Sequence, residues 1–353
     1  MNLDQRIKAL VKLGEFLGQF AGPNSTKNSK IPNNELFYDG FQHQLQLSQQ
    51  HNGWFTIDNL HFAINYWHGV LKYDTLKSWL SSYHLDNAPS KIVAIVMAGN
   101  IPLVGFHDLI TVLLVGHKVK VKLSSNDKHL IPYLVKYLEH IEPGFKGKVE
   151  FTEGKLEDFD AVIATGSNNT ARYFEYYFKG KPSIIRKNRN SIAVLTGAES
   201  DEQLSALSQD IFRYYGLGCR NVSKLFVPKD YNFDAFFNAM FSWKDIINDQ
   251  KYANNYDYNK AVYLMSEFDL LDNGFLMLKQ DENNASPIAT LFYEYYSDRT
   301  QLEERLDAMQ EDIQCIVSSN FKLQEEIAFG QTQYPKLSQY ADGIDTVDFL
   351  LKI

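Results

Sequence analysis

The sequence predicts an α/β fold built on a parallel, doubly wound sheet, and three observations lead to it. Short apolar runs rich in β-branched residues begin near residue 91 and recur along the chain. Segments of helical period, roughly 10–15 residues long, separate them, as in βαβ units. The chain has 353 residues, above the size at which a single core usually stops growing. We therefore expect two lobes.

The N-terminal part is predicted to be mainly helical. Apolar residues recur at helical spacing over residues 3–20 and again over 56–84. Thr56 precedes the second run and is a typical N-cap residue. Residues 21–34 are rich in Gly, Pro, Asn and Ser, which predicts a loop.

From residue 91 onward, strands and helices are expected to alternate. The predicted strands are 91–97, 118–123, 148–151, 161–164, 183–185, 192–195, 223–228 and 292–296. The predicted helices between them are 103–115, 128–141 and 201–215.

Composition excludes several classes of function. The net charge of −8 shows no chain-wide basic footprint, so nucleic acid is not an expected partner. Two cysteines far apart in sequence imply no disulfide framework and suit a reducing compartment. We find no signal peptide and no apolar run of about 18 residues, so no membrane span and a cytoplasmic location are expected. The nine histidines show no paired metal-ligand spacing, and no metal site is predicted.

Small residues follow three of the predicted strands. They are Gly99-Asn100, Ser124-Ser125 and Gly166-Ser167. Ligands of parallel α/β sheets bind at the carboxyl ends of strands, where small side chains let a ligand approach the backbone. A helix N-terminus that follows such a turn suits a phosphate group. Ordinary turn chemistry would explain each of these clusters equally well.

Cys219 is the candidate nucleophile. It lies in the stretch Gly-Leu-Gly-Cys-Arg-Asn at residues 216–221, between a predicted helix and a predicted strand. A cysteine on such a glycine-rich turn can be exposed, and the neighbouring cations Arg220 and Lys224 would favour its thiolate. The alternative from this local pattern is a small buried side chain without chemistry.

Four segments together resemble the aldehyde dehydrogenase superfamily. Residues 93–103 resemble its strand followed by Asn-x-Pro, 121–124 its Lys-Pro-Ser-Glu segment, 164–167 its Thr-Gly-Ser turn, and Gly218-Cys219 its nucleophile. The short length, the stretch around Cys219 and the terminal segments 328–335 and 342–345 resemble the acyl-CoA reductase branch. That branch includes the fatty-acid reductase subunit of bacterial luminescence systems.

The resemblance implies an aldehyde-dehydrogenase-like fold with a Rossmann-type cofactor lobe and a second α/β catalytic lobe. It implies that Cys219 attacks a thioester carbonyl and that the Asn100 amide helps to hold the oxyanion. Lys122, with Ser124 and Ser125, would lie at the cofactor ribose, and Gly166 and Ser167 at the pyrophosphate.

Two departures from the superfamily pattern bear on the reaction. Ile185 stands where the hydrolytic members carry the glutamate that activates water, so the acyl-enzyme should resist hydrolysis. Ser125 stands where a glutamate would repel a 2′-phosphate, and with Lys122 and Lys128 nearby this favours NADPH, or use of either NADPH or NADH. The nicotinamide-ribose glutamate has no clear counterpart; Glu282 and Asn283 are the nearest residues.

These observations define one hypothesis and its alternatives. Residues 1–187 would form the N-terminal helices and cofactor lobe, 188–330 the catalytic lobe, and 331–353 a returning segment. The function would be NAD(P)H-dependent reduction of an acyl-CoA, or of an acyl carrier, to an aldehyde. An aldehyde dehydrogenase, an acyl-phosphate reductase or a catalytically silent scaffold subunit are the alternatives. The superfamily's usual dimers and tetramers are compatible with a homo-oligomer.

Overall fold

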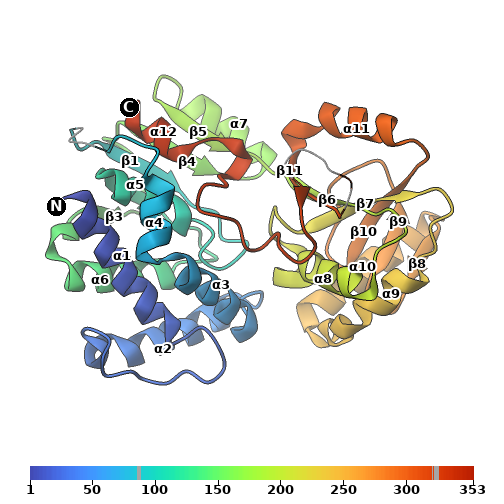
Figure 1. Ribbon diagram of the computed structural model, residues 1–353, viewed down its shortest axis with the longest axis horizontal. Helices are drawn as coiled ribbons and strands as arrows, with labels where there is room; N and C mark the ends of the chain where they lie inside the picture. The colour runs from blue at the N-terminus through green and yellow to red at the C-terminus, as the bar shows by residue number, and fades with distance from the viewer. Residues whose placement is uncertain (86–88, 320, 322–325) are drawn as a thin grey trace. The chain divides into compact units, whose positions relative to one another are not determined.

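The chain folds into two compact units in a computed structural model that describes residues 1–85, 89–319, 321 and 326–353. The first unit combines Met1–Lys187 with Lys336–Ile353, and the second is Asn188–Pro335. In Figure 1 the colour change from blue to red follows the chain through the first unit, then the second, and back to the first. The first unit is therefore built from both ends of the chain.

The first unit contains a five-stranded sheet in the order β3-β2-β1-β4-β5, with every pair parallel. Its strands are β1 (Ile92–Val96), β2 (Lys118–Lys122), β3 (Val149–Phe151), β4 (Ala161–Thr165) and β5 (Ser183–Arg186). Its helices are α1 (Leu3–Gly18), α2 (Asn34–His51), α3 (Ile57–Val70), α4 (Tyr73–Leu80), α5 (Phe106–Val115), α6 (Leu130–Ile141), α7 (Asn168–Tyr177) and α12 (Thr346–Leu351). The doubly wound α/β prediction is confirmed for this unit.

The predicted helical region over residues 56–84 contains two helices, α3 and α4. Thr56 caps α3 as expected, accepting a hydrogen bond from the Asn59 N–H at 3.4 Å. The chain then leaves the helix at Leu71, and α4 begins at Tyr73. Leu71 is fully buried, and a Cβ placed on Gly14 of α1 would lie 2.7 Å from the Leu71 Cβ. Helix α1 therefore packs closely against the break between α3 and α4. The spacing of apolar residues in the sequence gives no sign of this contact.

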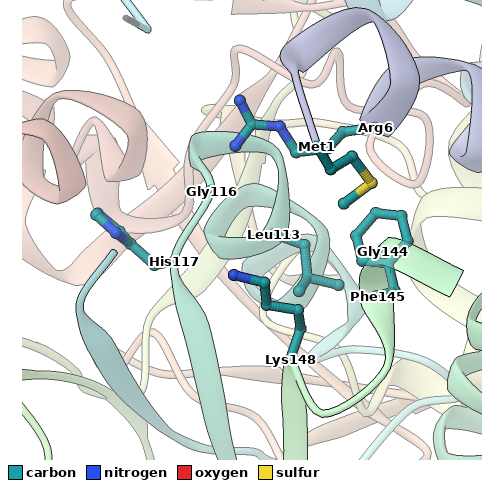
Figure 2. Close-up of a pocket in the computed structure, with 8 residues that line it drawn as sticks. All are labelled: Met1, Arg6, Leu113, Gly116, His117, Gly144, Phe145 and Lys148. Carbon is teal, nitrogen blue, oxygen red and sulfur yellow. The ribbon is translucent and has the colours of Figure 1, made fainter. Parts of the chain in front are cut away.

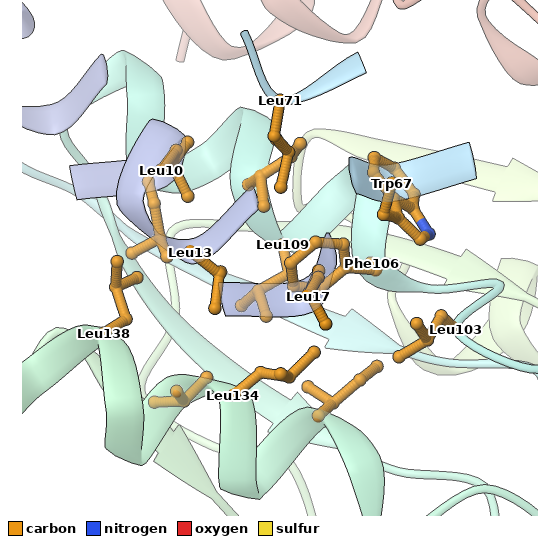
Figure 3. Packing of buried hydrophobic residues seen from close by; sticks show 14 of the residues in the cluster. Leu10, Leu13, Leu17, Trp67, Leu71, Leu103, Phe106, Leu109, Leu134 and Leu138 are labelled. Atoms are coloured by element: carbon orange, nitrogen blue, oxygen red, sulfur yellow. The ribbon is translucent and has the colours of Figure 1, made fainter. Parts of the chain in front are cut away.

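The core of the first unit lies between its helices and its sheet. Figure 3 shows leucines of α1 directed toward α5 and α6, with Trp67 of α3 packed beside Phe106. The rings of Trp67 and Phe106 meet edge to face with centroids 4.8 Å apart. Leu10 and Leu17 are fully buried. Each such leucine stabilises the fold by roughly 2 kcal/mol relative to an exposed side chain.

The C-terminal segment completes this unit through buried polar contacts. Asp108 in the first turn of α5 pairs with Arg186 at the end of β5 through two bonds of 2.5 and 2.8 Å. Arg186 also donates to the Thr346 hydroxyl at the start of α12. His107 Nε2 lies 2.9 Å from the Leu337 carbonyl, and burial lowers the pKa of this imidazole. The last eighteen residues are thereby held by the β5 end and by α5.

The second unit contains a seven-stranded sheet in the order β12-β11-β6-β7-β10-β9-β8. Its strands are β6 (Asn190–Val194), β7 (Val222–Pro228), β8 (Leu270–Asp272), β9 (Met277–Gln280), β10 (Thr290–Tyr296), β11 (Ile313–Val317) and β12 (Glu326–Ile327). Its helices are α8 (Asp201–Phe212), α9 (Asp234–Met240), α10 (Gln250–Met265) and α11 (Arg299–Ala308). The pairs are parallel except β8 with β9 at the edge. Within the described residues, no helix has the length and apolar character needed to cross a membrane.

Removing one charge of the buried pair is expected to destabilise the first unit. Asp108 and Arg186 are 4% and 7% exposed, so Asp108→Asn leaves a buried guanidinium without its counter-charge. We expect a loss of about 3–5 kcal/mol in the free energy of unfolding, measured by urea denaturation. Glu175→Gln is the control, because Glu175 forms an exposed ion pair with Lys187 and should change stability by less than about 1 kcal/mol. Equal effects of the two substitutions would contradict this prediction.

Candidate active site

The predicted site residues of the first unit follow adjacent strands. In the order β2-β1-β4, the parallel strands bring three carboxyl ends to one edge of the sheet. Asn100 follows β1, Ser124 and Ser125 follow β2, and Gly166 and Ser167 follow β4. The chain changes direction of winding between β1 and β4, which is the position where ligands bind in open α/β sheets.

The loop that carries Asn100 is held by buried contacts of Leu103. Asn100 is exposed, whereas Leu103 of the same loop is buried in the core and has a left-handed backbone with φ 59°. This conformation costs a non-glycine residue about 1–3 kcal/mol. The Leu103 N–H donates to Asp127 Oδ2 at 2.9 Å, and the Leu103 side chain is buried in the core. These two interactions hold the loop in place. Gly99 is required as well, because a Cβ there would lie 2.5 Å from the Ser124 Oγ.

Asp127 is a buried carboxyl group that the sequence did not single out. It is 4% exposed, and its Oδ1 has no hydrogen-bond partner among the described residues. Burial raises the pKa of Asp127 to about 6, while the bond from Leu103 acts in the opposite direction. Asp127 links the loop after β2 to the loop after β1, so its charge bears on both parts of the candidate site.

The loop after β2 has further anchors. The Ser125 carbonyl lies 2.6 Å from His51 Nε2 at the end of α2, and the Ser125 side chain is exposed. The Ser124 Oγ accepts the Asn126 N–H at 3.2 Å. Lys122 donates to the Gly154 carbonyl at 3.1 Å, so its ammonium group lies beside the loop that follows β3.

The turn after β4 leads directly into a helix. Ser167 is the N-cap of α7, and its hydroxyl accepts the Thr170 N–H at 3.3 Å. The Gly166 N–H donates to the Arg186 carbonyl at 3.2 Å. A Cβ on Gly166 would lie 3.0 Å from Thr170 and Phe174 side-chain atoms, so glycine suits this turn. The exposed N-terminus of α7 has the backbone N–H groups that bind phosphate in other proteins.

Cys219 lies in the second unit, exposed on a turn between α8 and β7. The predicted helix 201–215 ends earlier, at Phe212. Tyr214, Tyr215 and Gly216 then all have left-handed backbones, with φ of 54°, 59° and 76°. Such a run reverses the chain tightly, and it is stable only where the surrounding contacts compensate its strain.

Asn221 supplies those contacts. Its side chain is 2% exposed, and its Nδ2 donates to the carbonyls of Asp210 at 3.0 Å and Arg213 at 2.8 Å. Its Oδ1 accepts the Gly218 N–H at 2.9 Å. The amide thus satisfies the end of α8 and fixes the residue before Cys219. Ser191 adds a bond from its hydroxyl to the Cys219 carbonyl at 2.9 Å.

A second buried group lies beneath the same turn. The Asp210 carboxylate is fully buried and accepts the N–H groups of Gly330 and Thr332 together with the Thr332 hydroxyl. Burial raises the pKa of Asp210, and these bonds oppose the rise. Arg220 Nε donates to the Thr332 carbonyl at 2.5 Å. Residues 328–335, singled out for their sequence resemblance, thus pack against the nucleophile turn.

Lys224 does not have the surroundings expected of a cation that activates the thiol. Its side chain is fully buried on β7, where its ammonium group pairs with the Glu294 carboxylate and donates to the Glu282 carbonyl at 2.7 Å. Arg305 binds the same carboxylate through bonds of 2.6 and 2.7 Å. Burial lowers the pKa of Lys224 despite the partner. Arg220 is the cation that remains beside Cys219 in the sequence.

The two cysteines differ in their surroundings. Cys219 is exposed, whereas Cys315 on β11 is 3% exposed. Burial raises the pKa of the Cys315 thiol, which disfavours the reactive thiolate. Cys219 is therefore the candidate nucleophile on the grounds of access. Among the described residues, no group of His, Cys, Asp and Glu side chains could hold a metal ion.

A pocket of about 230 Å³ lies beside the nucleophile turn. Residues on both sides of Cys219 in the sequence contribute to it, from Gly216 and Leu217 to Val222 and Ser223. The rest of its lining is mostly apolar and aromatic: Ile211, Phe212, Tyr215, Tyr252, Leu276, Ser286, Pro287, Ile288, Ala289 and Thr290. Tyr252 of α10 thus lines a pocket beside the turn that carries Cys219.

Solved structures with the same fold are aldehyde dehydrogenases. One is a mutant of AldA, the indole-3-acetaldehyde dehydrogenase of P. syringae, in complex with NAD+ and IAA, with a TM-score of 0.67 at 14% identity over 92% of this chain and 74% of that one. KauB from Pseudomonas aeruginosa gives 0.67 at 14% identity over 91% and 73%. Aldehyde dehydrogenase 21 from Physcomitrella patens gives 0.65 at 13% identity over 90% and 73%. The predicted aldehyde-dehydrogenase-like fold is confirmed.

The narrower resemblance is confirmed by a family match. Residues 72–235 match the model of the family described as Acyl-CoA reductase (LuxC), a stretch that includes both Asn100 and Cys219. The chain therefore has an aldehyde-dehydrogenase-like fold and resembles the acyl-CoA reductase family over residues 72–235, which supports an oxidoreductase. No curated protein matches the chain.

Loss of the Asn221 amide is expected to loosen the nucleophile turn. Asn221→Ala leaves buried carbonyls and the Gly218 N–H without partners, which should lower the free energy of unfolding by about 1–3 kcal/mol. Asn255→Ala is the control, because Asn255 bonds a carbonyl on the exposed face of α10 and should change stability by less than about 0.5 kcal/mol. Urea denaturation measures both. A variant at Asn221 as stable as the control would contradict the role assigned to this amide.

The buried Asp127 carboxyl should make stability fall as pH rises. With a folded pKa near 6 and an ordinary value of 3.8, the folded chain holds a proton between these values that the unfolded chain has lost. Its contribution therefore declines between about pH 4 and 6 and is fully unfavourable above pH 6, by about 3 kcal/mol. Asp127→Asn should be more stable than the wild type at pH 8 and equal to it near pH 4, in denaturation curves. The reverse order, with the variant less stable at pH 8, would overturn this assignment.

Proposed function

We propose that the chain reduces an acyl thioester, such as an acyl-CoA, to an aldehyde through an acyl-enzyme on Cys219. The observation that carries the proposal is an exposed cysteine on a turn fixed by Asn221, within a stretch that matches the acyl-CoA reductase family. The neighbouring pocket offers apolar side chains to an acyl chain, together with hydroxyl groups such as those of Ser286 and Thr290.

The chemistry assigned to the residues is a sulfur exchange followed by a reduction. The Cys219 thiolate attacks the thioester carbonyl, and the tetrahedral oxyanion collapses with release of the CoA thiolate, which takes up a proton. The Asn100 amide and the Cys219 N–H are the proposed oxyanion donors; removing one such donor typically costs about 10²–10³ in rate. Hydride addition to the acyl-enzyme gives a thiohemiacetal, which collapses to the aldehyde and regenerates the Cys219 thiol.

The residues at the sheet edge fit a nicotinamide dinucleotide. When bound, this cofactor supplies the hydride. Gly166 and Ser167 at the start of α7 would hold its pyrophosphate, since the helix N-terminus is exposed and Gly166 leaves the backbone accessible. Lys122, Ser124 and Ser125 would lie at the adenosine ribose. The exposed, uncharged Ser125 and the exposed Lys128 favour NADPH, without excluding NADH.

Ile185 is consistent with a reductase. It lies on β5, and no carboxylate is available at this position to activate water against the acyl-enzyme. A dehydrogenase that forms carboxylic acids needs such a base. We therefore expect the acyl group to persist on Cys219 until hydride arrives.

Intact mass spectrometry after mixing the protein with a long-chain acyl-CoA, without cofactor, tests the proposal. The wild type should gain one acyl group, Cys219→Ala should gain none, and Cys315→Ala should behave as the wild type because Cys315 is buried. Adding NADPH should then discharge the adduct as aldehyde, faster than NADH does.

Two results would count against the proposal, and a third would change only its cofactor. Absence of an adduct with both short and long acyl-CoAs would remove the mechanism and favour aldehyde oxidation or a scaffold role. Release of carboxylic acid without cofactor would indicate a hydrolytic enzyme. A strong preference for NADH would overturn the assignment of NADPH alone and leave the thiol chemistry intact.

A further inference from the structure

A small pocket in the first unit lies at the end of the sheet away from the candidate site. Gly116 and His117 precede β2, and Lys148 precedes β3, so the pocket is at the amino ends of these parallel strands. The candidate cofactor residues follow the carboxyl ends. A five-residue strand such as β2 separates its two ends by about 16 Å. The pocket is therefore distinct from the proposed cofactor site.

The pocket contains a buried cation that has no counter-charge among the described residues. Arg6 of α1 is 8% exposed, and its side chain forms no ion pair or hydrogen bond with any residue that the structure describes. Its Nε is buried without a partner, and burial lowers the pKa of the guanidinium. Buried charges in proteins are normally paired, because an isolated one costs several kcal/mol of desolvation. A guanidinium in this state, lining a pocket, indicates an anion from outside the chain.

The other polar groups leave room for such an anion. Lys148 provides a second cation, and Figure 2 shows Arg6 and Lys148 around the same space, with Met1 and Phe145 on its other side. His117 is already satisfied: its Nδ1 accepts the Lys91 N–H, its Nε2 donates to the Leu350 carbonyl, and burial lowers its pKa.

Two carboxylates of the described residues near this pocket are engaged elsewhere. Glu142 Oε1 accepts the Gly144 N–H at 3.1 Å, and Asp160 Oδ2 accepts the Ile92 N–H at 2.8 Å. Neither forms an ion pair with Arg6 in the part of the chain that the structure describes. The guanidinium therefore depends on a partner other than these two side chains.

Gly116 explains how the guanidinium reaches this position. Gly116 ends α5 with a left-handed backbone of φ 107°, and a Cβ placed on it would lie only 2.1 Å from Arg6 Nη1. The guanidinium thus lies directly against the glycine backbone. Any other residue would be strained at this φ and would also displace Arg6 from the pocket.

We propose that this pocket binds one small oxyanion of the phosphate class, held by Arg6 and Lys148. Its volume of about 60 Å³ admits a few water-sized groups, which matches a single phosphate group and is too small for a nucleotide. Guanidinium groups bind phosphate oxygens through paired N–H donors, and lysine adds a point charge. The group could be inorganic phosphate or the end of a phosphomonoester whose remainder lies outside the pocket.

Thermal unfolding of the full chain in increasing inorganic phosphate, at constant ionic strength kept with chloride, tests the proposal. We expect a saturable rise in Tm of roughly 3 °C for the wild type. Arg6→Gln should abolish the saturable rise. Lys12→Gln should retain it, because Lys12 is an exposed cation on the same helix, outside the pocket. Lys148→Gln changes only the edge of the pocket, so it should fold normally and need several-fold more phosphate for the same rise.

Glycerol phosphate in place of inorganic phosphate distinguishes the two sources. An equal, Arg6-dependent rise with both assigns the site to a phosphate group in general, and a rise with inorganic phosphate alone assigns it to the free ion. The proposal is overturned if phosphate gives no saturable rise in the wild type, or if Arg6→Gln and Lys148→Gln both keep the full rise. A shift of that second kind would place phosphate at another site, such as the N-terminus of α7.

Discussion

The bonds of Asn221 are the interaction on which the candidate nucleophile depends. Cys219 has to be exposed to react, yet an exposed loop has little packing to hold it in place. The chain meets both requirements by placing a buried amide two residues after the cysteine, where it joins the end of α8 to Gly218. The strained backbone at Tyr214 and Tyr215 is stable because this amide and the Asp210 carboxylate fix the segments on either side.

The same principle operates at the sheet edge of the first unit. Asn100 is exposed, and the loop that bears it is fixed by Leu103 in the core and by the bond from Leu103 to Asp127. In each unit a candidate site residue at the surface is supported by one buried polar residue a few positions away or on a neighbouring loop. Such supports are costly to bury, which is why burial shifts the pKa of Asp127 and Asp210 upward.

Much of the fold could be predicted from local pattern, because buried parallel strands are continuous apolar runs and glycine turns separate them from helices. The candidate residues Asn100, Ser124, Gly166 and Cys219 could be named because small residues and a cysteine stand at strand and helix ends. The break at Leu71 could not, since it depends on packing against Gly14 from a distant helix. Nor could the pairing of Lys224 with Glu294, which joins strands far apart in the sequence. A single acidic residue among apolar ones in a helix, such as Asp108 or Asp210, is a sequence signal for a buried polar contact. The sequence does not show which distant residue is its partner.

The return of the C-terminal segment to the first unit has a consequence for how the chain is made. Residues 188–335 are contiguous, so the second unit has all its sequence before residues 336–353 are synthesised. The first unit, although its strands are synthesised first, lacks α12 and the Thr346 partner of Arg186 until residues 336–353 have been synthesised. The usual order, in which the N-terminal domain matures first, is therefore reversed for final packing. Until α12 has been synthesised, the nascent chain carries a sheet whose α5 face is still uncovered, and a chain that terminates before residue 346 would leave it so permanently.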